Sequence, residues 1–319
     1  MTWIVGTVPP FGYSILVSDI RVSWADGTER DCLQKIYKVG DDFLCGFAGS
    51  VKLGFILLDT LAAQLPRKQQ QTPLFLAHNW IPSLSRRVFQ SAPEPEKKLG
   101  CQLIVAAAHP TENLGDAPWP RTYVWTFAYP DFNPEQCGAN EVVGIGNGSA
   151  VSTYATALRE ARDNFSFLKL ITCGEGAQAE FLASTMFESV CKTATKGVSP
   201  FMQMGVLTRG KALLGNYNFT RFRADGSTTK IQVPLVANDY KTFLDFCQTG
   251  NFGSFSAVCC KLPAMHNTST LRYFYKAAIG WIPARINSFL SCGRIKLFSR
   301  IILSALAIFL LLTQLDFKD

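Results

Sequence analysis

The chain opens with residues 1–21, MTWIVGTVPPFGYSILVSDIR. Two short strand-like runs, Thr2–Thr7 and Tyr13–Ser18, flank the sequence Val-Pro-Pro-Phe-Gly, which has the composition of a hairpin turn. We therefore expect the fold to begin with two antiparallel strands, the first of which starts at Thr2.

A second strand pair and a helix follow directly. Lys35–Val39 and Phe43–Phe47 read as strands joined by a Gly-Asp-Asp turn. Gly49-Ser50 then ends the strand and provides a helix cap, because apolar residues recur at helical spacing from position 51 until Pro66.

Further along the chain, strands and helices occur in separate groups. A helical segment with a kink at Pro82 precedes a polar loop at 91–98, and a short helix is expected near 239–246. The other expected elements are the helices Thr72–Gln90, Ser149–Arg162 and Ala177–Ala194, and the strands Cys101–Ala107, Thr122–Phe127, Glu141–Ile145, Met202–Thr208, Asn218–Arg223 and Ile231–Pro234. This grouping predicts an α+β fold with helices packed outside stacked antiparallel sheets, because alternating βαβ units are missing from the pattern.

The charge of the chain is concentrated at its C-terminal end. The chain has 319 residues and a net charge of +7, but residues 1–260 contain 23 basic and 22 acidic side chains. A hydrophobic content of 48% is sufficient for a full core. The nearly neutral body argues against a nucleic-acid partner.

The cysteines and histidines indicate neither a metal site nor disulfides. The ten cysteines include no C-x-x-C pair, and the three histidines are far apart in sequence. The N-terminus lacks the basic and apolar regions of a secretory signal. We expect a cytoplasmic protein with reduced thiols and without a metal ion or organic cofactor.

An uncharged apolar run occupies Ile301–Leu315, after the basic residues Arg294, Lys296 and Arg300. Counted from Leu297, with Arg300 reaching toward the interface, it approaches the length of about 20 residues that spans a bilayer. The pattern favours a tail anchor that leaves the main domain at the inner face of a membrane, or else a buried helix or an accessory tail. The expected divisions are a main domain at 1–234, an extension at 235–293 and the basic and apolar tail at 294–319.

Thr2 can provide both a nucleophile and a base. Removal of Met1 before the small residue Thr2 would leave a free α-amine on Thr2. That amine has an ordinary pKa of about 7.7–8.0, so it can take the proton of the threonine hydroxyl and act as the base. Such a nucleophile needs no histidine.

Several segments at matching spacing resemble the proteasome β-subunit family. They are MTWIVGT at the start, Ser18-Asp19-Ile20-Arg21, Lys35-Ile36-x-x-Val39, Gly46-Phe47-Ala48-Gly49-Ser50 and the turn Gly144-Ile145-Gly146-Asn147-Gly148-Ser149. The resemblance covers residues 2–210 and is closest to the bacterial proteasome-like peptidase that works with an ATP-driven unfoldase. It implies the four-layer αββα sandwich of the N-terminal nucleophile hydrolases.

The resemblance also implies roles for the residues that match. Thr2 would be the nucleophile, and the Lys35 ammonium would lower the pKa of its amine by repulsion. Asp19 would pair with Lys35, and Arg21 would brace the Asp19 loop. The backbone N–H of Gly49 would stabilise the oxyanion at a helix N-terminus.

Three more residues complete the implied site. Phe47 and Val51 would line a narrow apolar pocket for the substrate side chain. Asn147 stands where the family usually has a serine, and its amide can still form a hydrogen bond to the N-terminal amine. The acidic residue often found in the helix after Gly49 is replaced by Lys52 and Leu53.

The implied function is a threonine-type endopeptidase that degrades unfolded proteins within a ring-shaped homo-oligomer, supplied by an ATP-dependent unfoldase. Two alternatives stay open. Asn147, the lack of the family's Asp-x-x-Ser element around Ser199–Gly205 and the apolar tail favour an inactive proteasome-like scaffold. An amidohydrolase of the same fold that acts on a small amide would use the same N-terminal chemistry.

Overall fold

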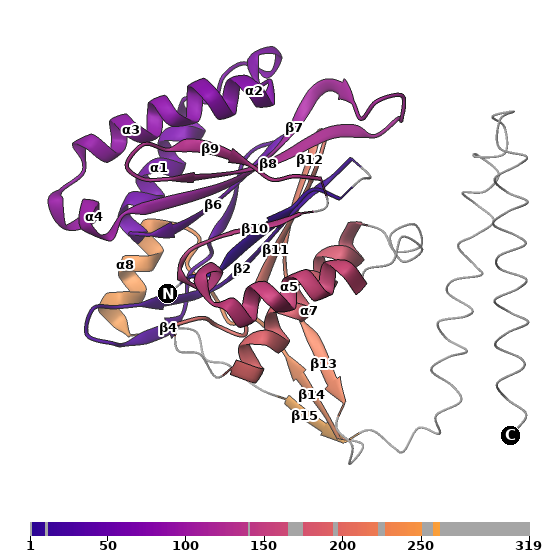
Figure 1. Cartoon of the computed structure of the whole chain (residues 1–319). Helices are drawn as coiled ribbons and strands as arrows, with labels where there is room; N and C mark the ends of the chain where they lie inside the picture. Colours follow the sequence, from indigo (N-terminus) through magenta and orange to yellow (C-terminus); the bar gives the residue numbers. More distant parts are fainter. Residues whose placement is uncertain are drawn as a thin grey trace, which may run out of the picture. The chain divides into compact units, whose positions relative to one another are not determined.

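Two antiparallel sheets of five strands each form the centre of the described chain (Figure 1). The first has the order β10-β1-β2-β11-β12, with bounds Val142–Ile145, Ile4–Thr7, Ser14–Asp19, Met202–Thr208 and Lys211–Asn216. The second has the order β5-β6-β7-β8-β9, with bounds Ile36–Gly40, Phe43–Gly49, Cys101–Asn113, Pro120–Ala128 and Asn133–Gln136. The expected α+β class with antiparallel sheets is confirmed.

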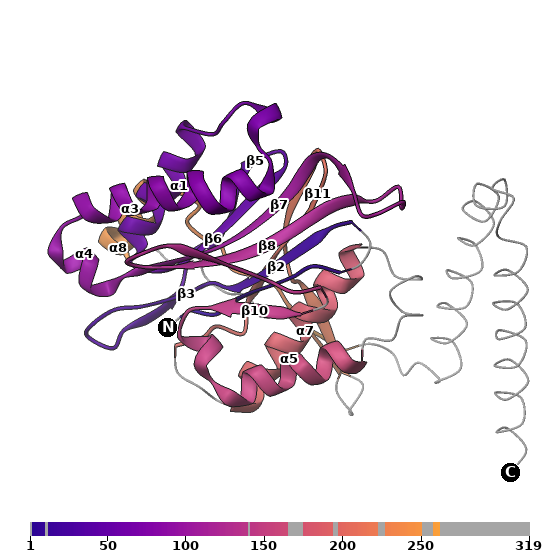
Figure 2. The same ribbon diagram turned by 45° about the horizontal axis from the view of Figure 1, so that its top comes forward.

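Helices cover the outer face of each sheet, and the sheets lie between them (Figure 2). The second sheet carries α1 (Val51–Ala63) and α3 (Ile81–Ser91), and the first carries α5 (Ser152–Asn164) and α7 (Glu175–Thr193). The remaining elements are β3 (Arg21–Ser23), β4 (Glu29–Asp31), η1 (Lys68–Gln70), α2 (Pro73–Phe75), η2 (Leu76–Trp80), α4 (Glu94–Leu99), η3 (Asn147–Ala150), β13 (Phe219–Phe222), β14 (Ser227–Ile231), α8 (Tyr240–Thr249) and β15 (Val258–Lys261).

The alternation of side chains along the strands explains this packing. Successive residues of a strand face opposite sides of its sheet. In β1 and β2, Ile4 and Leu16 pack between the two sheets, whereas Val5 and Val17 pack against α5 and α7. Because both faces are buried, these strands read as continuous apolar runs and not as an alternation of apolar and polar residues.

The described residues are 2–9, 12–139, 141–164, 175–193, 197–222, 227–250 and 258–261. The chain divides into two units, Met1–Lys261 and Leu262–Asp319. The expected tail and the run at 297–315 lie outside the described residues. No helix within the described ranges is long and apolar enough to cross a membrane.

The first unit includes α8, which follows position 234. Ala237 forms an isolated parallel bridge with Leu33, through hydrogen bonds from Ala237 N–H to the Cys32 carbonyl at 2.7 Å and from Gln34 N–H to the Ala237 carbonyl at 3.0 Å. On α8, the ring of Phe243 is buried in the cluster beneath α1. This segment is therefore part of the main core.

Some elements differ from the sequence expectation. Residues 91–98 were expected to form a loop but contain α4, which is stabilised by a proline in its first turn, by acidic residues near its N-terminus and by lysines near its C-terminus. The helix expected to begin at Ser149 begins at Ser152, because a 3-10 turn, η3, precedes it. The strands β3, β4, β9 and β12 were not anticipated, since they are short or exposed and lack a clear apolar pattern.

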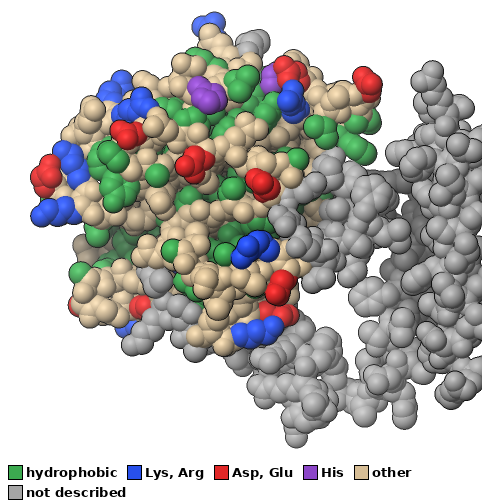
Figure 3. Space-filling view, in the orientation of Figure 1, with side chains coloured by type: hydrophobic (Ala, Val, Ile, Leu, Met, Phe, Trp, Pro, Cys, Tyr) green, Lys and Arg blue, Asp and Glu red, His purple; other side chains and the backbone are tan. Residues whose placement is uncertain are grey.

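Charged side chains are dispersed over the face of the main unit shown in Figure 3, where basic, acidic and apolar groups are interspersed. This distribution agrees with the nearly equal numbers of basic and acidic residues in 1–260. On that face the described basic and acidic side chains form no continuous patch of a single sign.

We expect Leu16→Ala to destabilise the protein. Leu16 is 0% exposed between the two sheets, and its truncation should lower the free energy of unfolding by about 2–5 kcal/mol. Urea denaturation followed by circular dichroism measures the change. Leu213→Ala, at a position that is 46% exposed on β12, is the matched control and should leave the midpoint nearly unchanged. Equal effects of both variants would contradict the packing of the sheets.

Candidate active site

The carboxylate of Asp19, the last residue of β2, is fully buried and is surrounded by donors. Its Oδ1 accepts hydrogen bonds from the Trp3 backbone N–H and from Lys35 Nζ, each at 2.8 Å. Its Oδ2 accepts from the backbone N–H of Arg21 at 3.0 Å and of Ser199 at 3.2 Å. A buried charge is tolerated when it is paired and hydrogen-bonded in this way. One side chain thus joins its own segment to three others, at Trp3, Lys35 and Ser199.

Lys35 is the cationic partner of Asp19 and is 2% exposed. Its Nζ also donates to the backbone carbonyl of Arg21 at 2.6 Å. Burial lowers the pKa of the Lys35 ammonium, and the neighbouring Asp19 carboxylate opposes this shift. Because Lys35 and the Trp3 amide share one carboxylate oxygen, the ammonium lies beside the first residues of the chain.

A short hairpin of β3 and β4 places Lys35 in this position. Its turn contains Gly27 with a φ of 83°, a conformation that favours glycine. The Arg21 guanidinium donates to both carboxylate oxygens of Asp31, at 2.8 and 3.0 Å, and to Glu29 at 3.1 Å. The hydrogen bond to Asp31 raises the pKa of Arg21. Arg21 therefore braces the hairpin from which the chain returns to Lys35.

Thr2 is half-buried and precedes β1, where a glycine-rich turn holds its backbone. The Thr2 carbonyl accepts from the Gly148 N–H at 3.0 Å. Gly146 has a φ of 82°, and a Cβ at this position would lie 2.3 Å from the Thr2 carbonyl oxygen. The Gly146 N–H in turn donates to Gln102 Oε1 at 2.8 Å. Asn147 is exposed between these glycines, and among the described residues its side chain forms no hydrogen bond.

Trp3, the residue after Thr2, is locked in place on the other face of the sheet. Its ring stacks on Tyr154 of α5, with centroids 4.3 Å apart and planes 15° apart. A Cβ on Gly148 would lie 2.4 Å from the Trp3 Cβ, so the turn packs directly on the tryptophan. With its N–H bound to Asp19, Trp3 fixes the direction in which Thr2 leaves the sheet.

Gly49 is the last residue of β6, and both its backbone conformation and its contact with Gly100 require a glycine. Its φ of 104° favours glycine, and a Cβ would lie 2.4 Å from the carbonyl oxygen of Gly100. Along β6 the N–H groups alternate in direction. Since the Phe47 N–H donates to the Lys35 carbonyl at 3.2 Å, the N–H of Gly49 points to the same side of the strand. Ser50 then caps α1, whose N-terminus adds a partial positive charge there.

The two residues expected to line a substrate pocket have different environments. Val51 is half-buried at the start of α1. Phe47 is buried beneath α1, with its ring 5.5 Å from that of Phe55 and 6.0 Å from that of Tyr37. The alternation along β6 turns Phe47 into the core on the helix side. Of the two, only Val51 is open to a ligand in this structure.

Three residues of the site were not identified from the sequence. Ser199 lies in a segment whose sequence contains no Asp-x-x-Ser element, yet its backbone N–H binds Asp19. Its hydroxyl accepts from the Phe201 N–H at 3.0 Å and so is used locally. Trp3 acts through the packing of its ring on Tyr154. Gln102 acts through one hydrogen bond, which its side-chain oxygen accepts from the backbone N–H of Gly146. Neither role leaves a motif in the sequence, so no local signal marked them.

The Cys32 thiol lies close enough to Lys35 for the two groups to interact electrostatically, but burial raises the pKa of this thiol to about 12. Burial raises the pKa of Cys101 to about 12, so this cysteine is a core residue and a poor nucleophile. Within the described part of the chain, no cluster of three or more His, Cys, Asp or Glu side chains is arranged to hold a metal ion.

Comparison with known proteins gives no independent indication of function. No family model matches the chain, and no curated protein matches it in sequence. The function must therefore be inferred from the geometry around Thr2, Asp19 and Lys35.

We expect Asp19→Asn to destabilise the fold strongly. The substitution leaves the Lys35 ammonium buried without a counter-charge, which costs about 3–5 kcal/mol. Thermal or urea unfolding measures the loss. The double variant Asp19→Asn/Lys35→Met removes both charges and should recover part of the stability.

The exposed pair of Lys38 and Asp41 provides the control, because both side chains are largely in water. Asp41→Asn should leave the unfolding midpoint unchanged. A double variant no more stable than Asp19→Asn alone would show that the charge pair is not the source of the effect.

Proposed function

We propose that the chain is a threonine-type peptidase whose nucleophile is Thr2 after removal of Met1. One observation carries the proposal. The Lys35 ammonium and the backbone N–H of Trp3 bind the same oxygen of a fully buried Asp19, so a cation lies next to the N-terminal residue. Such a charge favours the neutral, basic form of a free α-amine.

The chemistry would proceed through an acyl-enzyme. Thr2 Oγ attacks the peptide carbonyl carbon while its α-amine takes the hydroxyl proton. The Gly49 N–H and the N-terminus of α1 stabilise the oxyanion of the tetrahedral intermediate. The C–N bond then breaks and the leaving amine receives the proton. Water, deprotonated by the same amine, hydrolyses the ester and frees Thr2.

The arrangement of the layers supports the finer fold assignment within this proposal. One apolar cluster lies between the two sheets, and one more lies between each sheet and its helices. This succession is the one expected of the αββα sandwich of N-terminal nucleophile hydrolases. In that fold the nucleophile lies at the start of the first strand. Here Thr2 lies just before β1, which begins at Ile4.

The assembly and the cellular role belong to the same proposal and derive from the family resemblance. We propose a cytoplasmic homo-oligomeric ring that encloses the sites and receives unfolded protein from an ATP-dependent unfoldase. Attachment to the inner face of a membrane through the C-terminal tail would be an additional property.

A proteasome-like scaffold without activity is the second candidate. The observation that favours it is the exposed Asn147, which occupies the place of the family's serine and is not directed at Thr2 by any hydrogen bond among the described residues. Mass spectrometry separates the two candidates. An intact Met1 supports the scaffold, and a free Thr2 that reacts with an epoxyketone probe supports the peptidase.

The central test is the variant Thr2→Ala. It should abolish hydrolysis of a fluorogenic peptide, because the hydroxyl nucleophile is lost, while the unfolding midpoint stays close to that of the wild type. Thr2→Ser keeps a hydroxyl and should retain part of the activity. Undiminished hydrolysis by Thr2→Ala would refute the mechanism.

The pH profile tests the role of Lys35. In the wild type, the ammonium should hold the pKa of the Thr2 amine below its ordinary value of about 7.7–8.0, so the acid limb of kcat/KM should fall below that pH. Lys35→Gln removes the positive charge, and the amine then keeps its proton to a higher pH. The acid limb should therefore move to higher pH. A limb that stays in place in an active Lys35→Gln variant would exclude electrostatic tuning by Lys35.

A further inference from the structure

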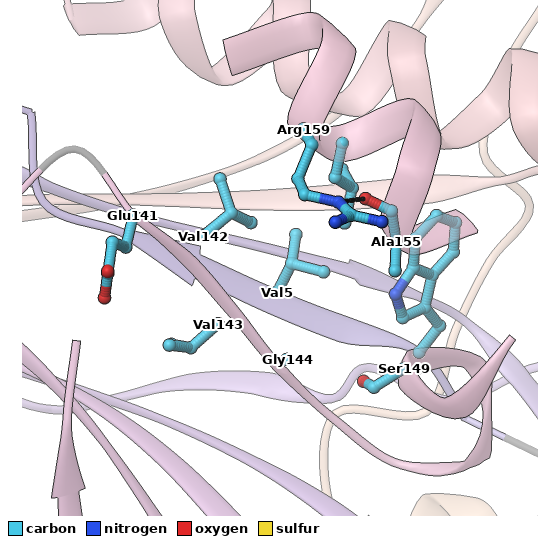
Figure 4. Close-up of a pocket in the computed structure, with 10 residues that line it drawn as sticks. Val5, Glu141, Val142, Val143, Gly144, Ser149, Ala155 and Arg159 are labelled. Carbon is cyan, nitrogen blue, oxygen red and sulfur yellow. Dashed lines mark hydrogen bonds between the residues drawn. The ribbon is translucent and has the colours of Figure 1, made fainter. Parts of the chain in front are cut away.

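The two edges of the first sheet differ in how their backbone groups are used. At one edge, helix α5 lies beside strand β10 (Figure 4). The Ile145 carbonyl of β10 accepts a hydrogen bond from Ser149 Oγ at 2.9 Å, and the Val143 N–H donates to the Cys137 sulfur. The outward groups of this edge are therefore bound within the chain.

Strand β12 is the opposite edge, at the end of the strand order β10-β1-β2-β11-β12. The Tyr217 N–H donates to the Met202 carbonyl at 2.8 Å, and the direction of the backbone groups alternates along a strand. The outward groups of β12 are therefore those of Ala212, Leu214 and Asn216. Within the described part of the chain, the N–H and C=O groups of these three residues form no hydrogen bond on the outer side of the sheet.

The sequence of β12 leaves this edge unprotected. Leu213 is 46% exposed and Leu214 is 44% exposed. Edge strands that stay unpaired commonly carry a proline, a bulge or central charged side chains. The sequence of β12 is Lys-Ala-Leu-Leu-Gly-Asn, its pairing with β11 has no bulge, and its one charged residue is the first. Such a strand is a template for pairing with another extended segment.

We propose that β12 pairs with β12 of a second copy of this chain, antiparallel about a two-fold axis at Leu214. Hydrogen-bonded pairs form only between residues whose backbone groups point outward. In this register Leu214 is opposite the partner's Leu214, and Ala212 is opposite the partner's Asn216. All three outward residues of each strand are then used, whereas a shift by two residues in either direction would lose a pair. The first sheets of the two copies become one continuous sheet.

The side chains are complementary in this register. A Cβ on Gly205 would lie 3.4 Å from Leu214 Cδ2, so Leu214 lies on the face between the two sheets, and its two copies meet there. On the other face, Leu213 is opposite the partner's Gly215, which has no side chain to obstruct it. The two Lys211 residues lie at opposite ends of the pair. Self-pairing thus covers both leucines without placing like charges side by side.

This contact is independent of the peptidase chemistry and of the ring proposed above. It is isologous, because both copies use the same strand, whereas a ring is closed by heterologous contacts. It also requires no reaction at Thr2. The pairing at β12 and the proposed function can therefore fail separately.

Position-specific disulfide cross-linking of the full-length chain tests the register. Residues in a hydrogen-bonded antiparallel pair have Cα atoms about 5.5 Å apart, which a disulfide can span. The background is Cys191→Ser/Cys247→Ser, which removes exposed thiols and gives the baseline. In it, Leu214→Cys should give a dimer on a non-reducing gel after oxidation with copper phenanthroline. Lys211→Cys is the matched control on the same strand and should stay at the baseline, because its copy lies at the far end of the pair.

Sedimentation equilibrium then measures the association itself. Leu214→Lys places two ammonium groups side by side at the axis and should raise the dissociation constant at least tenfold. Leu74→Lys, at a position that is 60% exposed on α2, is the control and should leave the constant unchanged. Urea midpoints verify that each variant is folded. A monomeric wild-type chain, equal cross-linking at positions 211 and 214, or undiminished association of folded Leu214→Lys would overturn the proposal.

Discussion

The buried carboxylate of Asp19 is the interaction on which the arrangement of the site depends. It binds the backbone of Trp3, Arg21 and Ser199 and the ammonium of Lys35, and so fixes the start of the chain against three later segments. An uncompensated charge at this depth would cost several kcal/mol, which means that the four donors must be present together. The position of Thr2 relative to Lys35 is therefore a consequence of a stability requirement. Any chemistry at Thr2 would use an electrostatic arrangement that the fold already needs.

The second constraint around the N-terminus is the close approach of glycine-containing backbone segments to one another. Gly146 and Gly148 allow the turn to contact Thr2 and Trp3 at distances that any side chain would prevent, and Gly49 allows β6 to end against Gly100. These contacts place backbone N–H groups near Thr2 and beside Lys35. On the opposite face of the first sheet, the Trp3 ring stacks on Tyr154 of α5, so the residue after Thr2 is held by packing as well as by Asp19.

Much of the core architecture was predictable because it depends on local patterns. The strands from Thr2 to Phe47 were recognised by apolar runs separated by turns, and α1 by its Ser50 cap and helical spacing. The sequence did not predict α4 or the β3–β4 hairpin, because these elements are short or exposed and lack a clear apolar pattern. Among the site residues, the pairing of Asp19 with Lys35 is present in the structure, and their role in catalysis stays a prediction. Phe47 was expected to line a substrate pocket, but the alternation of side chains along β6 directs its ring into the core.

The sequence by itself determined the features whose cause is local: the apolar strands, the Ser50 cap of α1 and the near neutrality of residues 1–260. It also predicts a nucleophile and a base at Thr2, because removal of Met1 would place a hydroxyl and a free α-amine on one residue. Only the tertiary structure decided that Ser199 reaches Asp19 and that Gln102 supports the turn at Gly146. These contacts join residues far apart in the chain through backbone groups and packing, and such interactions place little restriction on side-chain identity.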